Sequence, residues 1–398
     1  MRPFSLLIKP ASADCNLDCE YCFYTEKAAL YPDTLRHRMS EETLEQMVRN
    51  FFAAPQQEFA FGWQGGEPTL MGQKFFERAV ELQRRYAPPG STVSNGLQTN
   101  GTLIDDEFAA WLAENRFLVG ISIDGPVNVH DRYRKTRAGG GSHARVMRGL
   151  DALKRHGVEY NVLALVTQAN VREPAALYEY LKGLGASHHQ YIPCVETDEA
   201  GELTDYSVSG DDWGRFLSGL FDAWAPADAA EVSIRFFDSV LTKMLNGHAT
   251  VCYMGKDCRH YFVVEHSGDI YPCDFYVEPE RKLGNVADDA FVELWRSPAY
   301  REFGRKKRRW SESCEGCPYL AYCAGDCPKM RLDGDSGGGV ANRAAAGSSP
   351  GAATAAGEAG APSVLCAGWK QFYAHALPRF EELATEFRAG RLRRGEGP

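Results

Sequence analysis

Residues 14–24 read DCNLDCEYCFY and place three cysteines, Cys15, Cys19 and Cys22, within one short stretch near the start of the chain. A structural zinc site closes a tetrahedron with four ligands, and a disulfide framework needs an even number of cysteines in an oxidising compartment. Three thiolates on one loop suit a cubane iron–sulfur cluster that leaves one iron open to a ligand from outside the protein. A zinc loop that borrows its fourth ligand from elsewhere in the chain is the alternative.

Composition restricts the class of protein. The chain has 398 residues, 44% of them hydrophobic, and a formal net charge of −9. This length allows one large domain and a smaller one, and the acidic balance argues against nucleic acid as the main partner. We interpret the basic run RKKRR, residues 305–309, as a solvated helix face rather than a binding patch. Twelve cysteines, with no run that we read as a signal peptide or a membrane span, predict reduced thiols and a cytosolic location.

Short apolar runs alternate with stretches of helical period in the first half of the chain, which predicts parallel strands joined by helices. The predicted strands are 4–8, 59–63, 92–97, 118–123, 160–166 and 190–192. One predicted helix follows Ser40, a good N-cap, and others cover about 74–86, 105–115, 143–156 and 173–184. Six such units predict an α/β fold, a partial (β/α)6 barrel of the TIM type, with its chemistry at the C-terminal ends of the strands.

The alternation stops after about residue 235, and eight cysteines lie from Cys252 to Cys366. We therefore predict two domains, residues 1–235 and residues 236–398, the second held together by metal rather than by a large core. Residues 333–362 are rich in Gly, Ala and Ser and predict a flexible insert. Residues 370–388 recover helical spacing and predict a C-terminal helix that packs back onto the body.

The spacing C-x3-C-x2-C, followed by Phe23 and Tyr24, resembles the signature of the radical S-adenosylmethionine (SAM) superfamily. Residues 65–68, GGEP, directly follow the second predicted strand and resemble the segment that holds the SAM amino group in that superfamily. Glycine allows the backbone to approach such a ligand closely. The resemblance implies a [4Fe–4S] cluster on the three cysteines, SAM on its open iron, and SAM contacts from Tyr21, Gly66, Ser122, Arg134 and Val195.

The later cysteines follow the spacings C-x9-G-x4-C, from Cys258, and C-x2-C-x5-C-x3-C, from Cys314. This resembles the SPASM extension of peptide-modifying radical SAM enzymes. Eight thiols would ligate two further [4Fe–4S] clusters, and a pair of zinc ribbons is the alternative. The resemblance implies that one auxiliary cluster is held by Cys252, Cys258, Cys273 and Cys327. It implies that the other is held by Cys314, Cys317, Cys323 and Cys366, which leaves Cys194 without an assigned role.

Within the SPASM group the chain is most similar to anaerobic sulfatase-maturating enzymes, through the complete ligand set, CDF at 273–275 and QTNG at 98–101. The resemblance implies a radical SAM oxidoreductase that converts a cysteine or serine of a nascent sulfatase, in a Cys/Ser-x-Pro-x-Arg-like motif, to Cα-formylglycine. It implies Asp274 as the base that takes the substrate proton, and an electron donor such as a flavodoxin or ferredoxin. The alternatives are a SPASM-type maturase that forms a thioether or other crosslink in a ribosomal peptide, and a metal-binding module without turnover.

The insert gives the first testable prediction. We expect a chain in which residues 333–362 are replaced by a short linker to keep most of its activity and all of its iron. The composition of these residues cannot bury a core, and each doubling of loop length changes the closure free energy by only about 0.6 kcal/mol. Iron and sulfide analysis together with an assay of SAM cleavage would check this. Loss of one cluster's worth of iron on trimming would contradict it, because the insert would then be needed to position Cys366.

Overall fold

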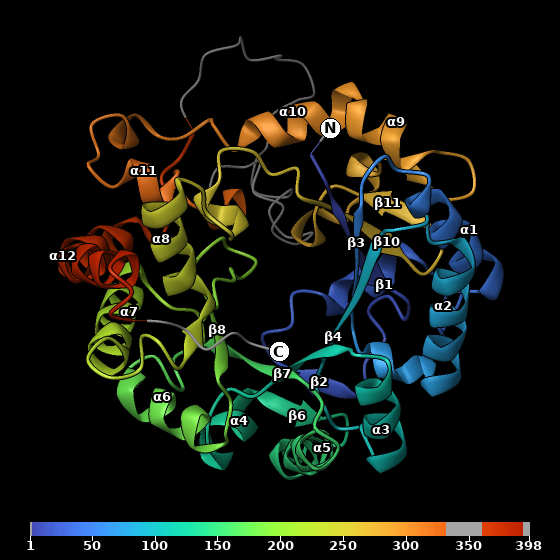
Figure 1. Cartoon of the computed structure of the whole chain (residues 1–398), viewed down its shortest axis with the longest axis horizontal. Coiled ribbons are helices and arrows are strands. Elements are labelled where there is room, and N and C mark those ends of the chain that lie inside the picture. Colours follow the sequence, from blue (N-terminus) through green and yellow to red (C-terminus); the bar gives the residue numbers. More distant parts are fainter. Residues whose placement is uncertain (1, 332–359, 393–398) are drawn as a thin grey trace. The chain divides into compact units, whose positions relative to one another are not determined.

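The computed structural model describes residues 2–331 and 360–392 (Figure 1). Most of the predicted insert, residues 333–359, lies outside these ranges. The chain forms two compact units from discontinuous segments. The first unit contains Met1–Ile123, His130–Tyr160 and Arg259–Gly304, and the second contains Asp124–Val129, Asn161–Cys258 and the described residues from Arg305 on. The domain boundary expected near residue 235 stays a prediction, because these units interleave along the chain.

The first unit is built on parallel strands in the order β10-β1-β3-β4-β5, and β11 and β12 extend the β10 edge in antiparallel fashion. The bounds are β1 (Ser5–Lys9), β3 (Glu58–Trp63), β4 (Thr92–Thr99), β5 (Leu118–Ser122), β10 (Tyr261–Glu265), β11 (Asp269–Tyr271) and β12 (Gly284–Asn285). A separate antiparallel pair joins β2 (Leu17–Cys19) to β6 (Arg134–Thr136). Apolar side chains that alternate along the strands fill the core, as at Phe59, Phe61 and Trp63.

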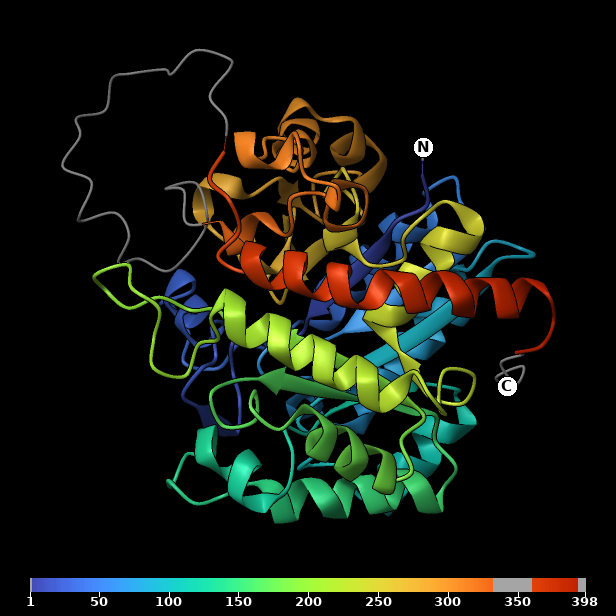
Figure 2. The ribbon, with the colours of Figure 1, turned by 90° about the vertical axis from the view of Figure 1, so that its left-hand side faces the viewer.

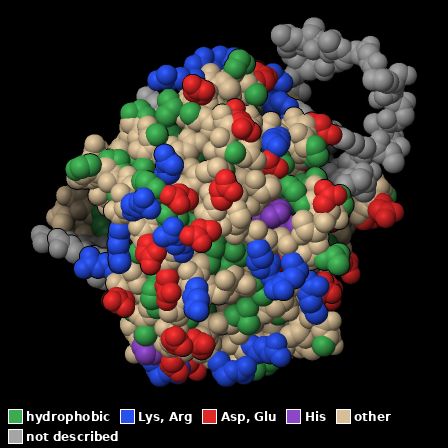
Figure 3. All heavy atoms as spheres, turned by 90° about the vertical axis from the view of Figure 1, so that its right-hand side faces the viewer, with side chains coloured by type: hydrophobic (Ala, Val, Ile, Leu, Met, Phe, Trp, Pro, Cys, Tyr) green, Lys and Arg blue, Asp and Glu red, His purple; other side chains and the backbone are tan. Residues whose placement is uncertain are grey.

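Helices follow the strands of the first unit. The periodicity predicts α1 (Glu41–Phe52), α2 (Gln73–Tyr86), α3 (Asp106–Glu114) and α5 (His143–Arg155), whereas α9 (Phe291–Arg296) was not predicted. Helices α4 (Val127–Tyr133) and α10 (Pro298–Lys306) each pass from one unit to the other. Ser40 caps α1, its hydroxyl accepting a hydrogen bond from Thr43 N at 3.0 Å. Basic and acidic side chains are intermixed on the face that carries α1, α2 and α3 (Figure 3), where Arg78 pairs with Glu41 at 2.7 Å.

The second unit pairs β7 (Tyr160–Val166), β8 (His188–Pro193) and β9 (Ser233–Ile234) in parallel. Its helices are α6 (Pro174–Gly183), α7 (Gly210–Trp224), α8 (Arg235–Asn246), α11 (Leu320–Cys323) and α12 (Cys366–Arg388). Helix α12 lies alongside α7 (Figure 2). The two helices approach closely through glycines, since a Cβ atom on Gly368 would lie 2.1 Å from the carbonyl oxygen of Gly210. The predicted C-terminal helix is thus confirmed, and it begins at Cys366, four residues earlier than expected.

All six strands predicted from apolar runs are present, as β1, β3, β4, β5, β7 and β8. In addition, β10, which follows residue 235, pairs with β1, and no pattern in the sequence predicts this pairing. The sequence of a strand does not show which strand it pairs with, because the pairing is made by backbone N–H and C=O groups. Among the described helices, none combines the length and apolar character that a membrane span requires.

Candidate active site

Cys15, Cys19 and Cys22 lie on the loop that leaves the C-terminal end of β1, and Cys19 is the last residue of β2. The Cys15 sulfur accepts hydrogen bonds from Leu17 N at 3.4 Å and from Asn100 Nδ2 at 3.7 Å. Burial raises the pKa of the Cys15 thiol to about 11. Because a bound metal needs the thiolate, metal binding must displace this proton.

The segment Gly65–Pro68 lies directly against the cysteine loop. Gly66 N donates to the carbonyl oxygen of Ser12 at 2.7 Å, and Glu67 N donates to that of Asp14 at 2.7 Å. A Cβ atom on Gly66 would lie 2.1 Å from the Asp14 carbonyl oxygen. Only glycine therefore fits at position 66, and the backbone there is held next to the three cysteines.

Glu67 connects this segment to the QTNG loop that follows β4. Its carboxylate is fully buried and accepts four hydrogen bonds, from Thr69 N (3.0 Å), Thr69 Oγ1 (2.6 Å), Thr99 Oγ1 (2.7 Å) and Asn100 N (2.8 Å). Burial raises the pKa of Glu67, and these hydrogen bonds oppose that rise. Asn100 in turn donates to Asn16 Oδ1 at 2.9 Å, beside Cys15. Three loop segments are thus joined around one buried carboxylate.

The first unit brings two of the predicted SAM contacts together. The guanidinium of Arg134 lies 5.5 Å from the centroid of the Tyr21 ring, and Arg134 is the register partner of Cys19 in the β2–β6 pair. Ser122 ends β5, as expected, and its hydroxyl accepts from Gln98 Nε2 at 3.2 Å. Val195 is buried and belongs to the second unit. The roles of these residues, like that of Gly66, stay predictions.

Asp274 directly follows Cys273 and is held by side chains from two strands. Tyr261 on β10 donates its hydroxyl to Oδ1 at 2.9 Å and lies 3.3 Å from the Cys273 sulfur. Lys9, the last residue of β1, places its ammonium 3.9 Å from Oδ2. A carboxylate with two such partners has a fixed orientation, which a general base requires.

Lys9 and Glu265 were not anticipated from the sequence. They are register partners at the C-terminal ends of β1 and β10, and both are buried. Burial lowers the pKa of Lys9, while the carboxylates of Asp274 and Glu265 oppose that shift. The signal that could have revealed them is a single charged residue at the end of each otherwise apolar strand, SLLIK and YFVVE.

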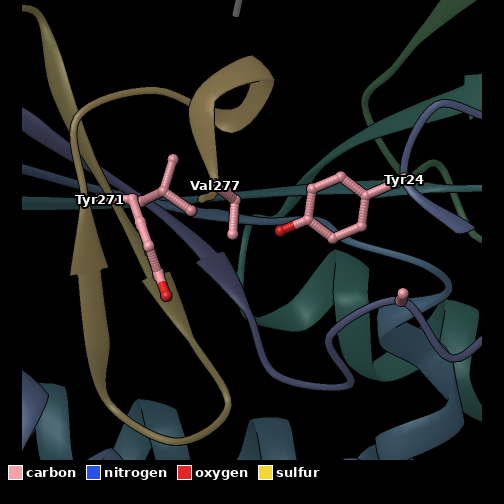
Figure 4. Packing of buried hydrophobic residues seen from close by; sticks show 5 residues of the cluster. Tyr24, Tyr271 and Val277 are labelled. Atoms are coloured by element: carbon pink, nitrogen blue, oxygen red, sulfur yellow. The ribbon is translucent and has the colours of Figure 1, made fainter. Parts of the chain in front are cut away.

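The aromatic ring of Tyr24 packs against the buried charged pair of Lys9 and Glu265. The Lys9 ammonium lies 4.3 Å from the centroid of the Tyr24 ring, and the Tyr24 hydroxyl donates to Glu265. The ring points toward Val277 within a buried apolar cluster that also contains Tyr271 (Figure 4). An apolar wall beside fixed charges keeps bulk water from screening them.

Four cysteines of the second unit line one hollow. Its walls include Cys314, Cys317, Cys323 and Cys366, together with Trp369 and Lys370. Burial raises the pKa of the Cys323 thiol to about 12. These are the four thiols assigned to one auxiliary cluster by resemblance, and one hollow that collects four sulfur ligands fits such a group.

Three of the other four thiols, those of Cys252, Cys258 and Cys327, also belong to the second unit, and Cys273 belongs to the first. The pKa of Cys327 is raised by burial first and then by the nearby Cys252 thiol. Among the described residues, no three Cys, His, Asp or Glu side chains are grouped so as to hold a single metal ion.

Comparison with known families agrees with these observations. The profile of the radical SAM superfamily matches residues 10–181, and that of the SPASM iron–sulfur cluster-binding domain matches residues 246–318. These matches confirm the expected combination of a radical SAM core and a SPASM extension.

Curated relatives align over nearly the whole chain. The serine-type anaerobic sulfatase-maturating enzyme of Bacteroides thetaiotaomicron is 37% identical, over 97% of this chain and 92% of the relative. The cysteine-type enzyme of Clostridium perfringens is 36% identical, over 98% of this chain and 100% of the relative.

Solved structures give the same result. Native anSMEcpe with bound AdoMet and the Kp18Cys peptide superposes with a TM-score of 0.85 at 36% identity, covering 97% of this chain and 100% of that one. SuiB of Streptococcus suis bound to S-adenosylmethionine has a TM-score of 0.59 at 17% identity, covering 82% of this chain and 73% of that one, a likeness of fold alone.

The buried carboxylate gives a prediction about stability. We expect Glu67→Gln to lower the free energy of unfolding by about 1–3 kcal/mol, because the amide NH₂ replaces an acceptor and faces donors that then have no partner. Thermal unfolding under anaerobic conditions would measure the change. Glu58→Gln is the matched control, since Glu58 is exposed on β3. Equal stability of the two variants would mean that the hydrogen bonds to Glu67 contribute little.

Proposed function

The chain belongs to the family of anaerobic sulfatase-maturating enzymes, and on that premise we propose that it oxidises a cysteine or serine of a nascent sulfatase to Cα-formylglycine. The observation that carries the proposal is near full-length identity of 36–37% to both serine-type and cysteine-type relatives. The charged groups of Lys9 and Asp274, which lie 3.9 Å apart, support it. The substrate is then a sulfatase polypeptide, and we propose a Cys/Ser-x-Pro-x-Arg-like motif in it.

The cofactors are three [4Fe–4S] clusters and SAM. The residues proposed to hold the SAM-binding cluster are Cys15, Cys19 and Cys22. The ligands proposed for the first auxiliary cluster are Cys252, Cys258, Cys273 and Cys327, and those for the second are Cys314, Cys317, Cys323 and Cys366. For SAM itself we propose Tyr21, Gly66, Ser122, Arg134 and Val195. When bound, SAM and the cluster on the first three cysteines would supply the 5′-deoxyadenosyl radical that removes a Cβ hydrogen atom from the substrate. An auxiliary cluster would supply the acceptor for the second electron.

The residues of the chain supply the proton chemistry. Asp274 takes the thiol or hydroxyl proton of the substrate residue, and Tyr261 and Lys9 hold its carboxylate at 2.9 Å and 3.9 Å. Loss of this proton, of the Cβ hydrogen atom and of one further electron, for which a bound auxiliary cluster would be the acceptor, leaves an aldehyde from serine, or a thioaldehyde that water hydrolyses from cysteine. A flavodoxin or ferredoxin as electron donor and a cytosolic location remain part of the proposal.

The proposal is tested by anaerobic incubation with SAM, dithionite and peptides that carry Cys-x-Pro-x-Arg or Ser-x-Pro-x-Arg. Mass spectrometry should show a carbonyl oxygen in place of the side-chain sulfur or hydroxyl. The variant in which Cys15, Cys19 and Cys22 are all alanine is the control and should form no 5′-deoxyadenosine. A crosslinked peptide as the product would favour the ribosomal-peptide maturase instead.

We predict that Asp274→Asn cleaves SAM but forms formylglycine about 10²–10⁴ times more slowly, since the amide keeps the shape of the carboxylate and cannot accept the proton. The ratio of formylglycine to 5′-deoxyadenosine measures this directly. Asp288→Asn, at an exposed position after β12, is the matched control and should leave the ratio unchanged. Formation of formylglycine by Asp274→Asn at the rate of the parent enzyme would assign the base to another group.

A further inference from the structure

Two cations are buried among the auxiliary cysteines of the second unit. Lys307 is fully buried and Arg331 is 2% exposed. Lys307 Nζ donates to the carbonyl oxygens of Tyr253, at 3.0 Å, and Asp326. Arg331 donates to the carbonyl oxygens of Gly325, Asp326, Lys307 and Arg309 at 2.8–3.2 Å. In the part of the chain that the structure describes, neither side chain forms an ion pair.

The carboxylate of Asp326, next to Cys327, accepts its hydrogen bonds from uncharged donors. Asp326 is 3% exposed. Its Oδ1 accepts from Cys327 N at 2.7 Å, and its Oδ2 accepts from Ser363 Oγ at 2.7 Å and from Trp369 Nε1 at 2.8 Å. Burying a charge without a counter-charge is expensive. Asp326 carries a single negative charge and is hydrogen-bonded by uncharged groups, so a further negative charge beside Lys307 and Arg331 would be stabilised.

The carbonyl groups that receive these cations belong to the loops that carry cysteine ligands. Tyr253 follows Cys252, and Asp326 precedes Cys327, so the ammonium of Lys307 connects the loops of two thiols. The positive charge of Lys307 also acts electrostatically on the Cys258 thiol. Burial raises the pKa of Cys258 to about 11, and the positive charge of Lys307 opposes that rise.

We propose that Lys307 and Arg331 are the buried counter-charges of the auxiliary clusters and raise their reduction potentials. A [4Fe–4S] cluster with four thiolates carries net negative charge, which increases when an electron is added. A cation in a medium of low dielectric constant therefore stabilises the reduced state more than the oxidised one. The inference rests on the proposed function, in which an auxiliary cluster takes the electron left by substrate oxidation. Both residues act through the clusters and are positioning residues rather than catalytic ones.

The test uses the full chain with Cys15, Cys19 and Cys22 replaced by alanine, so that only the auxiliary clusters contribute to the EPR spectrum. In this background Lys307→Gln keeps an N–H donor for the carbonyl groups and removes the charge. With iron content unchanged, we expect a redox titration to show a shift of at least one auxiliary cluster to a more negative potential. Lys307→Arg keeps the charge and should keep the potential. Arg305→Gln, an exposed position in the last turn of α10, is the control and should cause no shift.

An unchanged potential in fully loaded Lys307→Gln and Arg331→Gln would overturn the proposal. If Lys307→Gln loses iron, Lys307→Arg decides: recovery of both iron and potential supports a role for the charge. Loss of iron in both variants would show that Lys307 only ties two loops together, and this would also overturn the proposal. The potentials are measured without substrate, so they remain informative even if the chain forms no formylglycine, a result that would contradict the proposed function alone.

Discussion

Two backbone hydrogen bonds hold the cysteine loop in place, from Gly66 N to Ser12 O and from Glu67 N to Asp14 O. They require the backbone at position 66 to approach so closely that no side chain fits. The carboxylate of Glu67 then fixes Thr99 and Asn100, and Asn100 reaches the Cys15 sulfur. The geometry of the first three thiols therefore depends on neighbouring loops rather than on the cysteine loop alone.

Features with a local pattern could be predicted from the sequence. Neighbouring residues are enough to show the alternation of apolar side chains along β3 and β4 and the N-cap at Ser40. The spacing of the cysteines likewise identifies the loops that carry ligands. That Cys366 would join Cys314, Cys317 and Cys323 came only from family resemblance, because no spacing rule reaches across the intervening chain. The structure places all four around one hollow.

Features that depend on contacts between distant segments could not be predicted. Lys9 reads as the end of an apolar strand, and only the pairing of β1 with β10 shows that Glu265 lies beside it. The basic run 305–309 was interpreted as a solvated helix face, and this is wrong for Lys307, which is fully buried beyond the end of α10. A charged side chain can be buried where carbonyl groups converge, and the sequence does not show where they do so.

The pairing of β1 with β10 also sets an order of events during synthesis. Ser5 pairs with Tyr261, about 250 positions later in the chain, and a ribosome that adds 5–20 residues per second needs roughly 10–50 s to cover that distance. During this interval one edge of the N-terminal strand stays open, and Lys9 has neither Glu265 nor Asp274 beside it. An open strand edge invites wrong pairing, so the nascent chain has a long period in which a chaperone can bind it.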